Sequence, residues 1–382
     1  MFEMSDYTEI KQKHLPDPEY LVIQNFGINS ATYIRTMSYE NNKLCTILKN
    51  AYGNEVVIVP SGMNAISTTL FTILNQNHNK KINIVYASEL YYETSETILW
   101  LKNKFKCTHK IFDIINHETN LINYANEIET YDNNLKPDVN ILFAESCSNP
   151  NGYVINYDTL KQIKEINKNW IIIIDNTWLT HVLSNPFLDS DNCVDYVILS
   201  LTKYYSTGTA ICGAIITANN YNEIFNTINM FGLHVSPITC QIILDNVKNI
   251  NERLTKASNN TINILNKLKD NNEIIISHPY INNKQSNNNK QSIFYSELYP
   301  SIFTIQINIK QKNITQTKFI KLLENYSIEC KTSFGYKHSR IDTWIIPSID
   351  NTIKFRLSIG YLDDYNIIYN ELLKIIEELK LS

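Results

Sequence analysis

The sequence predicts an α/β protein in which buried strands alternate with helices. Short apolar runs rich in β-branched residues recur along the chain, and stretches of helical periodicity lie between them. Several strand runs end in polar or ionisable residues, which places those residues at the end of a covered strand. With 382 residues, of which 43% are hydrophobic, the chain is long enough to bury a large core and to form two domains.

The first regular elements are expected after Tyr39, where a helical pattern begins. Glu55–Pro60 and residues 82–87 (INIVYA) are apolar and rich in β-branched residues, so two buried strands are expected there. Between them, residues 61–63 (Ser-Gly-Met) precede the helical run AISTTLFTIL. A helix start next to glycine presents free N–H groups and a positive dipole end, which suits a phosphate, although a capped helix without a ligand has the same pattern.

A turn is predicted over residues 88–96, and it carries two adjacent tyrosines, Tyr91 and Tyr92. Val139–Ala144 is the next buried strand, and the segment after it contains Asn149. The tetrapeptide Asn-Pro-Asn-Gly that begins at this asparagine forms turns readily, so Asn149 has a structural explanation as well as a functional one.

A run of isoleucines from Ile171 to Ile174 ends in Asp175, which puts a carboxylate at the carboxyl end of a fully buried strand. Burying a carboxylate without a partner is unfavourable. A protonated ring nitrogen is the partner that a pyridoxal phosphate (PLP) site supplies. Keeping that nitrogen protonated makes the ring an electron sink for a carbanion.

Val194–Leu199 is a similar buried run, and it is followed by Ser200, Thr202 and Lys203. A lysine acts as a nucleophile or base near neutral pH when a dry, partly cationic site lowers its pKa, and an apolar strand end is dry. The hydroxyls suit a cofactor phosphate and the amine suits a cofactor aldehyde. A solvated lysine capping a strand is the alternative for this short motif, but the buried acid of the preceding strand favours a PLP site.

The C-terminal part is expected to form a second domain. The pattern turns helical after Ala218 and continues over residues 246–260. Asn271–Ser292 is rich in asparagine and poor in apolar residues, so a mobile loop is expected. Strands are predicted at residues 301–309 (SIFTIQINI) and 354–360 (KFRLSIG).

Composition argues against several classes of function. The chain has 34 basic and 38 acidic side chains, a formal net charge of -4 and no basic stripe, so a nucleic-acid partner is not expected. The polar N-terminus does not read as a secretory signal, and no apolar run approaches the length of a membrane span. The seven cysteines are scattered without a C-x-x-C pair, which favours free thiols in a reducing cytoplasm and gives no support to a metal site.

Several short motifs fall in one order and together resemble the Cys/Met-metabolism family of PLP enzymes. They are SGM at residues 61–63, FAESCSNPNG at Phe143–Gly152, DNTWL at Asp175–Leu179, SLTKY at Ser200–Tyr204 and FRLSIG at Phe355–Gly360. That family includes cystathionine γ-synthase, cystathionine γ- and β-lyases, methionine γ-lyase and O-acetylhomoserine sulfhydrylase. The resemblance implies a PLP-dependent transferase fold of type I, aspartate-aminotransferase-like, with a large, mostly parallel sheet domain and a smaller α+β C-terminal domain.

The resemblance also implies catalytic roles. Lys203 would bind the cofactor aldehyde and act as general base, and Asp175 would keep the ring nitrogen protonated. Tyr91 would stack on the ring and pass a proton to a leaving group, with Tyr92 as the fallback if the register differs by one residue. The cofactor-binding residues implied are Ser61, Gly62, Met63, Tyr91, Asn149, Asp175, Thr177, Ser200, Thr202 and Lys203, together with Tyr33 and Arg35.

Substrate binding is implied for Arg356, which matches the family arginine that binds the α-carboxylate, and for Asn149 and Ser333. A strand-edge arginine paired with a carboxylate of the C-terminal helix is the structural alternative for Arg356. His181 is expected to be an incidental loop residue.

In the family, a Tyr-x-Arg pair reaches the cofactor phosphate of the neighbouring subunit, and Tyr33 and Arg35 match it here. The planar fork of arginine suits a phosphate. A homodimer or homotetramer with shared active sites is therefore implied. The expected organisation is an N-terminal arm for subunit contact over residues 1–50, a PLP-binding large domain over residues 51–245 and a small domain over residues 246–382.

Departures from the family pattern concern the far end of the substrate. Family members that act on cystathionine commonly carry glycines and then an arginine after the stacking tyrosine, where this chain has Glu93 and Glu96. A carboxylate in place of that arginine would repel a distal carboxylate by about 4 kcal/mol at an effective dielectric of 20 and 4 Å. We therefore expect a neutral or cationic distal group, or positive charge supplied by Lys337 and His338.

The predicted function is γ-elimination or γ-replacement on a small-molecule substrate, an amino acid with a sulfur-bearing or activated (O-acyl type) side chain, with a thiol as co-substrate in the replacement reaction. β-Elimination of the cystathionine β-lyase kind is the nearest alternative. From a different class, a degenerate homologue that keeps the fold and binds without turnover is also compatible with the altered segments.

Overall fold

The centre of the fold is a seven-stranded sheet in the order β1-β7-β6-β5-β4-β2-β3. The computed structural model describes residues 38–285, 294–308, 316–342 and 352–381. The strands of this sheet are β1 (Glu55–Val59), β2 (Ile82–Ala87), β3 (Thr108–Phe112), β4 (Val139–Glu145), β5 (Trp170–Asp175), β6 (Tyr196–Ser200) and β7 (Gly213–Thr217). Strands β2 to β6 pair in parallel, whereas β7 is antiparallel to both of its neighbours.

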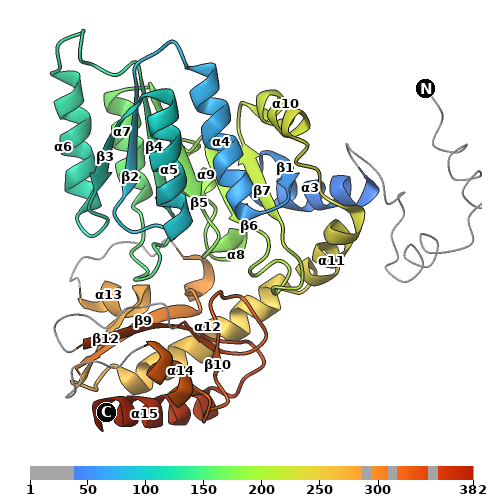
Figure 1. The fold of residues 1–382 in the computed structure, drawn as a ribbon, viewed down its shortest axis with the longest axis vertical. Helices are drawn as coiled ribbons and strands as arrows, with labels where there is room; N and C mark the ends of the chain where they lie inside the picture. Colours follow the sequence, from blue (N-terminus) through green and yellow to red (C-terminus); the bar gives the residue numbers. More distant parts are fainter. Residues whose placement is uncertain (1–37, 286–293, 309–315, 343–351, 382) are drawn as a thin grey trace, which may run out of the picture.

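Helices cover both faces of this larger sheet (Figure 1). They are α3 (Tyr39–Tyr52), α4 (Gly62–Gln76), α5 (Tyr92–Phe105), α6 (His117–Glu129), α7 (Tyr157–Ile166), α8 (Thr180–Leu183), α9 (Pro186–Asp189), α10 (Tyr221–Phe231) and α11 (Pro237–Val247). Because the central strands are enclosed on both sides, β2 and β4 are buried at every residue. The α/β class predicted from the sequence is confirmed.

A five-stranded sheet, in the order β10-β11-β12-β9-β8, lies below the larger one in Figure 1. Its strands are β8 (Ile274–Ser277), β9 (Ile302–Asn308), β10 (Glu329–Cys330), β11 (Arg340–Asp342) and β12 (Thr352–Ser358). The remaining helices are α12 (Ile250–Leu268), α13 (Pro279–Gln285), the 3-10 turn η1 (Tyr295–Glu297), α14 (Gln316–Leu323) and α15 (Tyr365–Leu381). Side chains on one face of this sheet, including Ile305, Phe355 and Leu357, form a second hydrophobic core with α12 and α15.

The Asn-rich segment Asn271–Ser292 was expected to be a loop, and this prediction is wrong for its first part. Ile274–Ser277 forms β8, which pairs with β9, and Pro279–Gln285 forms α13. Backbone pairing with a neighbouring strand stabilises this short isoleucine run. His278 between the two elements is fully buried, and Nε2 of its ring lies 2.8 Å from Pro300 O.

The turn expected over residues 88–96 is shorter than predicted, because α5 begins at Tyr92. Strand β6 begins at Tyr196 and not at Val194. The carboxylate of Asp195 accepts hydrogen bonds from Ile172 N at 2.8 Å and from Lys164 Nζ. These hydrogen bonds fix the position of the residue that precedes β6.

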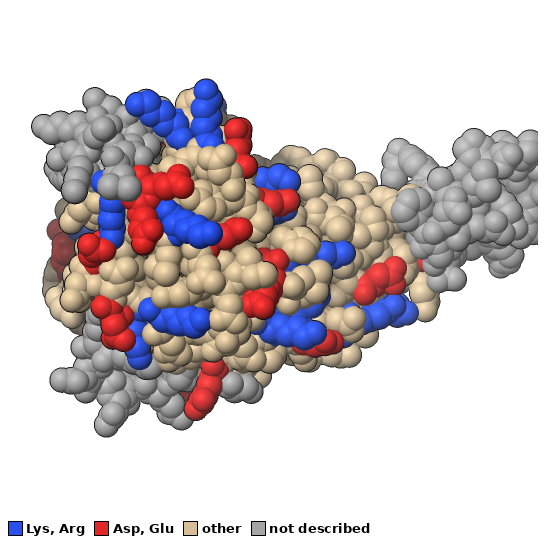
Figure 2. All heavy atoms as spheres, turned by 90° about the horizontal axis from the view of Figure 1, so that it is seen from below, with Lys and Arg blue, Asp and Glu red and all other residues tan. Residues whose placement is uncertain are grey.

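The described residues contain no helix that is both long and apolar enough to cross a membrane. Figure 2 shows the face that lies lowest in Figure 1, where Lys and Arg side chains alternate with Asp and Glu side chains. This face therefore carries no extended area of one charge.

Candidate active site

The carboxyl edge of the larger sheet brings together polar residues from neighbouring strands. Glu145 ends β4, Asp175 ends β5 and Ser200 ends β6. Glu145 and Asp175 are direct partners in the parallel register. In open α/β sheets this edge is where ligands bind.

Lys203 lies in the turn after β6 and is directed toward the turn that precedes β11. Its Nζ donates a hydrogen bond to Ser333 Oγ at 2.6 Å and lies 5.3 Å from the centre of the Phe334 ring. Burial lowers the pKa of Lys203 to about 8, and the positive charges of Arg356 and Arg340 act in the same direction. Near neutral pH the neutral amine is therefore more populated than in a free lysine, as a nucleophile or base requires.

Asp175 is held at the end of β5 by the residue two positions later. Its Oδ1 accepts a hydrogen bond from Thr177 N at 2.9 Å. Burial raises the pKa of Asp175 to about 6, while Thr177 and the charge of Lys203 oppose that rise. Thr177 Oγ1 in turn accepts a hydrogen bond from Ser200 N at 2.8 Å, so it joins the ends of β5 and β6.

The N-terminus of α4 lies against the end of β6, and glycine makes this approach possible. A Cβ atom on Gly62 would lie 2.8 Å from Ser200 Cβ, and one on Gly213 would lie 2.2 Å from Ser61 O. Ser61 caps the helix by accepting a hydrogen bond from Asn64 N at 3.0 Å. The first turn of α4 contains no acidic residue, so its free N–H groups are suited to an anion such as a phosphate.

Met63 and Thr202, which are also expected to bind the phosphate, lie at the start of α4 and in the turn after β6. Met63, in the first turn of α4, offers its backbone N–H. Thr202 Oγ1 donates to Cys212 O at 3.2 Å and accepts from Cys212 N at 3.1 Å. The Thr202 hydroxyl therefore closes the base of the loop that carries Lys203.

Glu145 positions two of the expected site residues, although no role for it was predicted from the sequence. Its Oε1 accepts a hydrogen bond from Tyr91 N at 2.6 Å and its Oε2 accepts one from Asn149 N at 2.8 Å. Burial and the neighbouring charge of Asp175 raise the pKa of Glu145. The argument that singled out Asp175, a carboxylate at the end of a buried strand, applies to Glu145 equally and could have identified it.

Tyr91 immediately precedes α5, and its side chain is 44% exposed. Its phenol is affected by two charged neighbours. Burial raises the pKa of Tyr91 and the charge of Glu93 raises it further, whereas Arg356 acts in the opposite direction. Tyr91 is thus close enough to Arg356 to share one site with it.

Arg356 lies on β12 and is buried together with its partners. Its Nη1 donates to Asn149 Oδ1 at 2.5 Å, and its Nη2 forms an ion pair with Asp342. Asp342 is the strand partner of Arg356 across β11 and β12. A buried guanidinium without a carboxylate would be strongly unfavourable, so Asp342 is a further site residue, and it could not be assigned without the strand register.

The turn between β10 and β11 lies directly against the backbone of Lys203. A Cβ on Gly335 would lie 2.8 Å from Lys203 C. Ser333 adopts a left-handed φ of 84°, which is uncommon for a residue with a side chain. Strained backbone conformations cluster at active sites, and here Ser333 contacts the lysine amine.

Tyr33 and Arg35, which were also expected to bind the cofactor, lie outside the described residues. His181, on α8, is partly buried, its Nδ1 lies 2.8 Å from Tyr205 Oη, and burial lowers its pKa to about 4. It is therefore a neutral packing residue. His338 lies 2.8 Å from Asp363 and Lys337 is exposed.

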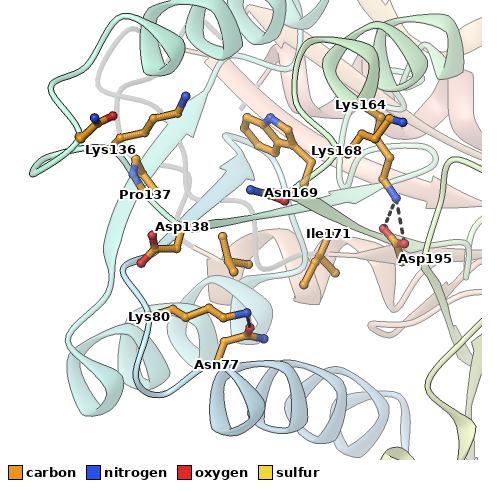
Figure 3. Close-up of a pocket in the computed structure, with 13 residues that line it drawn as sticks. Asn77, Lys80, Lys136, Pro137, Asp138, Lys164, Lys168, Asn169, Ile171 and Asp195 are labelled. Carbon is orange, nitrogen blue, oxygen red and sulfur yellow. Dashed lines mark hydrogen bonds and ion pairs between the residues drawn. The ribbon is translucent and has the colours of Figure 1, made fainter.

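A broad cavity of about 870 Å³ lies at the opposite edge of the larger sheet (Figure 3). It is lined by residues at the amino ends of β4 and β5. Three of its lysines already have partners: Lys164 binds Asp195, Lys136 binds Glu129 and Lys80 binds Asn77. The strand-end residues described above are absent from its lining, so this cavity is not the candidate active site.

The arrangement fits PLP. A lysine with a lowered pKa, a buried acid at the end of the adjacent strand and a helix N-terminus opened by Gly62 match the aldehyde, the ring nitrogen and the phosphate of that cofactor. Arg356 and Asn149 together are suited to a carboxylate beside the lysine.

Comparison with known proteins agrees with this interpretation. A family model described as Cys/Met metabolism PLP-dependent enzyme matches residues 23–354. L-methionine γ-lyase of Fusobacterium nucleatum subsp. nucleatum is 26% identical over 263 residues, which are 64% of this chain and 60% of that protein. Cystathionine β-lyase of Schizosaccharomyces pombe is 24% identical over 293 residues, 74% of this chain and 67% of that protein. The chain thus spans about 60% of the length of the γ-lyase.

Solved structures share the fold. A putative O-acetylhomoserine (thiol)-lyase from Campylobacter jejuni, which carries an N′-pyridoxyl-lysine-5′-monophosphate residue, has a TM-score of 0.69 at 20% identity, covering 93% of this chain and 90% of that one. Cystathionine γ-synthase from Xanthomonas oryzae pv. oryzae has a TM-score of 0.72 at 17% identity, covering 91% and 88%. The expected fold of type I is confirmed.

Proposed function

The chain belongs to the Cys/Met metabolism family of PLP-dependent enzymes, and from this membership we propose that it catalyses γ-elimination or γ-replacement on an amino acid with a sulfur-bearing or activated side chain. The relatives named L-methionine γ-lyase support γ-chemistry. When bound, PLP supplies an electron sink for a carbanion at the substrate α-carbon.

Lys203 is the residue proposed to hold the cofactor and then to move protons. Its pKa of about 8 would suit a general base that removes the α-proton of the substrate. Tyr91 is the residue proposed to donate a proton to the leaving γ-substituent. The elimination reaction would consume water and give a 2-oxoacid, ammonia and the released γ-substituent, whereas the replacement reaction would exchange that substituent for a thiol.

Arg356 and Asp175 have positioning and electrostatic tasks in this proposal. The guanidinium of Arg356 is held by Asn149 and Asp342, so its orientation is set before a substrate α-carboxylate arrives. The Asp175 carboxylate would hold the proton of the ring nitrogen. Asp175 follows three buried isoleucines and is itself partly exposed, at the edge of the sheet where the cofactor is proposed to bind.

The observation that carries the proposal is the hydrogen bond between Lys203 Nζ and Ser333 Oγ. This bond brings the lysine from the larger sheet to the turn of the smaller one. The Phe334 ring there lies 5.3 Å from Lys203 Nζ and 5.9 Å from Arg356 Cζ. The amine and the carboxylate-binding group therefore meet on the same side of the site.

Purified protein incubated with PLP tests the proposal. We expect a yellow holoenzyme whose absorbance is bleached by borohydride, with the reduced pyridoxyl group mapped to Lys203 by mass spectrometry. Lys203→Ala should lose the covalent adduct and at least about 100-fold in turnover. A colourless preparation that neither binds PLP nor consumes any substrate would contradict the proposal.

The product distinguishes the γ-reaction from its nearest alternative. The holoenzyme is incubated with L-methionine, cystathionine or O-acetyl-L-homoserine, each with and without a thiol. 2-Oxobutanoate, or a new thioether, is the expected product. Pyruvate from cystathionine would instead assign β-elimination, which the cystathionine β-lyase relative keeps as the second candidate.

The proposal includes an assembly and a compartment. We propose a homodimer or homotetramer in which Tyr33 and Arg35 of one subunit contribute to the active site of its neighbour. We also propose that the boundaries between the N-terminal arm, the large domain and the small domain lie after residues 50 and 245. All seven cysteines lie in the described part of the chain and none of them is in a disulfide there, which supports the cytoplasm as the compartment. Light scattering of the holoenzyme and of Arg35→Ala, with PLP affinity measured for both, tests the shared site.

A further inference from the structure

Arg340 is a charged residue beside the candidate site for which the proposed reaction has no task. It begins β11, and its side chain is only 12% exposed. Its guanidinium carbon lies 3.2 Å from the centre of the Tyr336 ring, so the two planar groups are in contact. Arginine in such a contact is held flat, with its N–H groups directed outward along the edge.

The strand register places Arg340 on the face of the smaller sheet that meets Lys203. Asp342 is paired with Arg356 across β11 and β12, and paired residues project to the same face. Arg340 lies two residues before Asp342, and alternate residues of a strand also share a face. Arg340, Asp342 and Arg356 therefore line one surface, opposite to the core side that contains Ile341.

Tyr336 fixes this surface against the loop that carries Lys203. A Cβ on Gly208, in that loop, would lie 2.0 Å from Tyr336 Cε1, so the tyrosine ring occupies the space that a side chain would need. The ring thus contacts the lysine loop, and Arg340 contacts the ring. The charge of Arg340 also lowers the pKa of Lys203, after the larger effects of burial and of Arg356.

The terminal nitrogens of Arg340 are available for a ligand. Within the part of the chain that the structure describes, its hydrogen bond and ion pair are both made by Nε, with Glu329 Oε2 at 3.1 Å. Glu329 is itself shared with Lys331. Nη1 and Nη2 form the fork that binds a carboxylate through two parallel hydrogen bonds.

From this geometry we propose that Arg340 binds an anionic group at the far end of the substrate side chain, so that the preferred substrate is an amino acid with a second carboxylate. This inference rests on the proposed function and names its substrate class. Arg340 lies diagonal to Arg356 across β11 and β12, two residues from the direct pair that Asp342 makes with Arg356, and such diagonal neighbours are about 7 to 8 Å apart. Arg356 and Arg340 are therefore spaced to bind the two carboxylates of one small molecule.

The cations expected from the sequence are less suited to this task. His338 lies 2.8 Å from the Asp363 carboxylate, and its side chain is 62% exposed. Lys337 is exposed as well. Glu93 and Glu96, which led us to expect a neutral or cationic distal group, are both exposed on α5, where water screens their charge.

Two activated substrates that differ by one carboxymethyl group test the proposal. O-Succinyl-L-homoserine and O-acetyl-L-homoserine break the same bond, but the succinyl compound carries the additional carboxylate. We expect the wild-type holoenzyme to have the higher kcat/KM on the succinyl compound. Arg340→Ala should lower that value by about 10-fold to 100-fold and change the value for the acetyl compound by less than about threefold. Arg340→Lys should recover part of the loss.

Lys337→Ala is the matched control, because it removes an equal charge from the turn that precedes β11. Its ratio of kcat/KM for the two compounds should equal that of the wild type. An equal loss on both compounds in Arg340→Ala, or a wild type without preference, overturns the proposal. A loss of PLP affinity without a change in the substrate ratio also overturns it, because Arg340 would then serve the cofactor.

A binding measurement separates failure of this inference from failure of the proposed function. L-2-Aminoadipate and L-norleucine have the same chain length but differ in their terminal group, and neither carries a γ-leaving group. We expect aminoadipate to raise the Tm of the wild-type holoenzyme more than norleucine does, and the difference to vanish in Arg340→Ala. If no homoserine ester is turned over but this difference is present, the reaction assignment fails and the carboxylate site stands. Equal responses to both probes reject the site.

Discussion

Glu145 is the residue on which the geometry of the candidate site most depends at the scale of single side chains. One buried carboxylate accepts a hydrogen bond from the backbone of Tyr91 and another from the backbone of Asn149. The first residue precedes α5 and the second follows β4, so they reach the site from different elements. Their spacing is set by a side chain that need not contact the substrate.

Glu145→Gln should therefore reduce activity by misplacing its two neighbours. The amide keeps one acceptor but turns an NH2 group toward the other backbone N–H, which leaves a buried donor without an acceptor, at a cost of about 1 to 3 kcal/mol. We expect kcat/KM to fall by about 5-fold to 100-fold. Steady-state kinetics measures this fall in kcat/KM. A titration with PLP should show a smaller change in the PLP dissociation constant. Activity equal to wild type would show that the two bonds are dispensable.

The pair formed by Tyr91 and Glu93 leads to a prediction about pH. Burial and the Glu93 charge raise the pKa of Tyr91. Glu93→Gln removes the charge, so the pKa of the phenol should fall and the protonated form should be lost at lower pH. If Tyr91 donates a proton to the leaving group, the alkaline limb of the kcat/KM profile should move to lower pH. Glu96→Gln, one turn further along α5, is the control and should leave the limb in place.

At the scale of elements, the approach of α4 to β6 is the feature that prepares the site for an anion. The two elements meet at Gly62 and Ser200, where a Cβ would lie 2.8 Å from another Cβ. This contact depends on a residue without a side chain at the first position of the helix. The N–H groups of α4 and the Ser200 hydroxyl are thereby brought to one place.

Gly62→Ala should weaken cofactor binding more than it weakens folding. The methyl group would push α4 away from β6 and displace the phosphate-binding N–H groups, so we expect the PLP dissociation constant to rise by about 10-fold or more. Absorbance titration with PLP measures this rise. Ser67→Ala, further along the same helix, is the matched control. An unchanged dissociation constant for Gly62→Ala would argue against phosphate binding at this helix end.

Sequence patterns were sufficient for the elements of the larger sheet. The isoleucine run before Asp175 and the apolar run before Ser200 are buried strands, because continuous burial leaves a continuous apolar signature. The prediction of a loop in the Asn-rich segment failed because β8 is short. Its stability comes from pairing with β9, which is distant in the sequence. The local amino-acid composition does not predict pairing with a distant strand.

At the scale of the whole molecule, the site is formed by two sheets that must be held in register. Asn151, just after β4, connects them. Its backbone O accepts a hydrogen bond from Ser277 at 2.8 Å, its Oδ1 accepts one from Thr304 at 3.2 Å, and its Nδ2 donates to Glu89 at 2.5 Å. Lys203 belongs to one side of this junction and Arg356 to the other.

Asn151→Ala should loosen the junction. Loss of the two side-chain bonds is expected to lower the free energy of unfolding by about 1 to 2 kcal/mol. KM should rise more than kcat falls, since the carboxylate-binding arginine would be displaced from the lysine. Urea unfolding and steady-state kinetics test both effects. Thr304→Val removes only the hydrogen bond to Asn151 and should have the smaller effect of the two variants. A wild-type free energy of unfolding and a wild-type KM in both variants would refute the role of the junction.

The candidate site was predictable where a residue follows a strand and unpredictable where two strands bring residues together. Lys203 and Asp175 could be proposed from their positions at the ends of apolar runs. The pairing of Arg356 with Asp342 and the position of Arg340 depend on the register of β11 against β12, which no local pattern reveals.

Strand β7 returns the chain beside β6, so that Ser200 faces Gly213 and the segment between them is closed at its base. The length of this segment determines how far the amine of Lys203 lies from the sheet. Sequence changes elsewhere in the chain do not alter that length. Residues before β11 on the smaller sheet can then diverge without displacing the amine. This separation offers a route by which descendants of one ancestor could acquire new substrates while retaining the same chemistry.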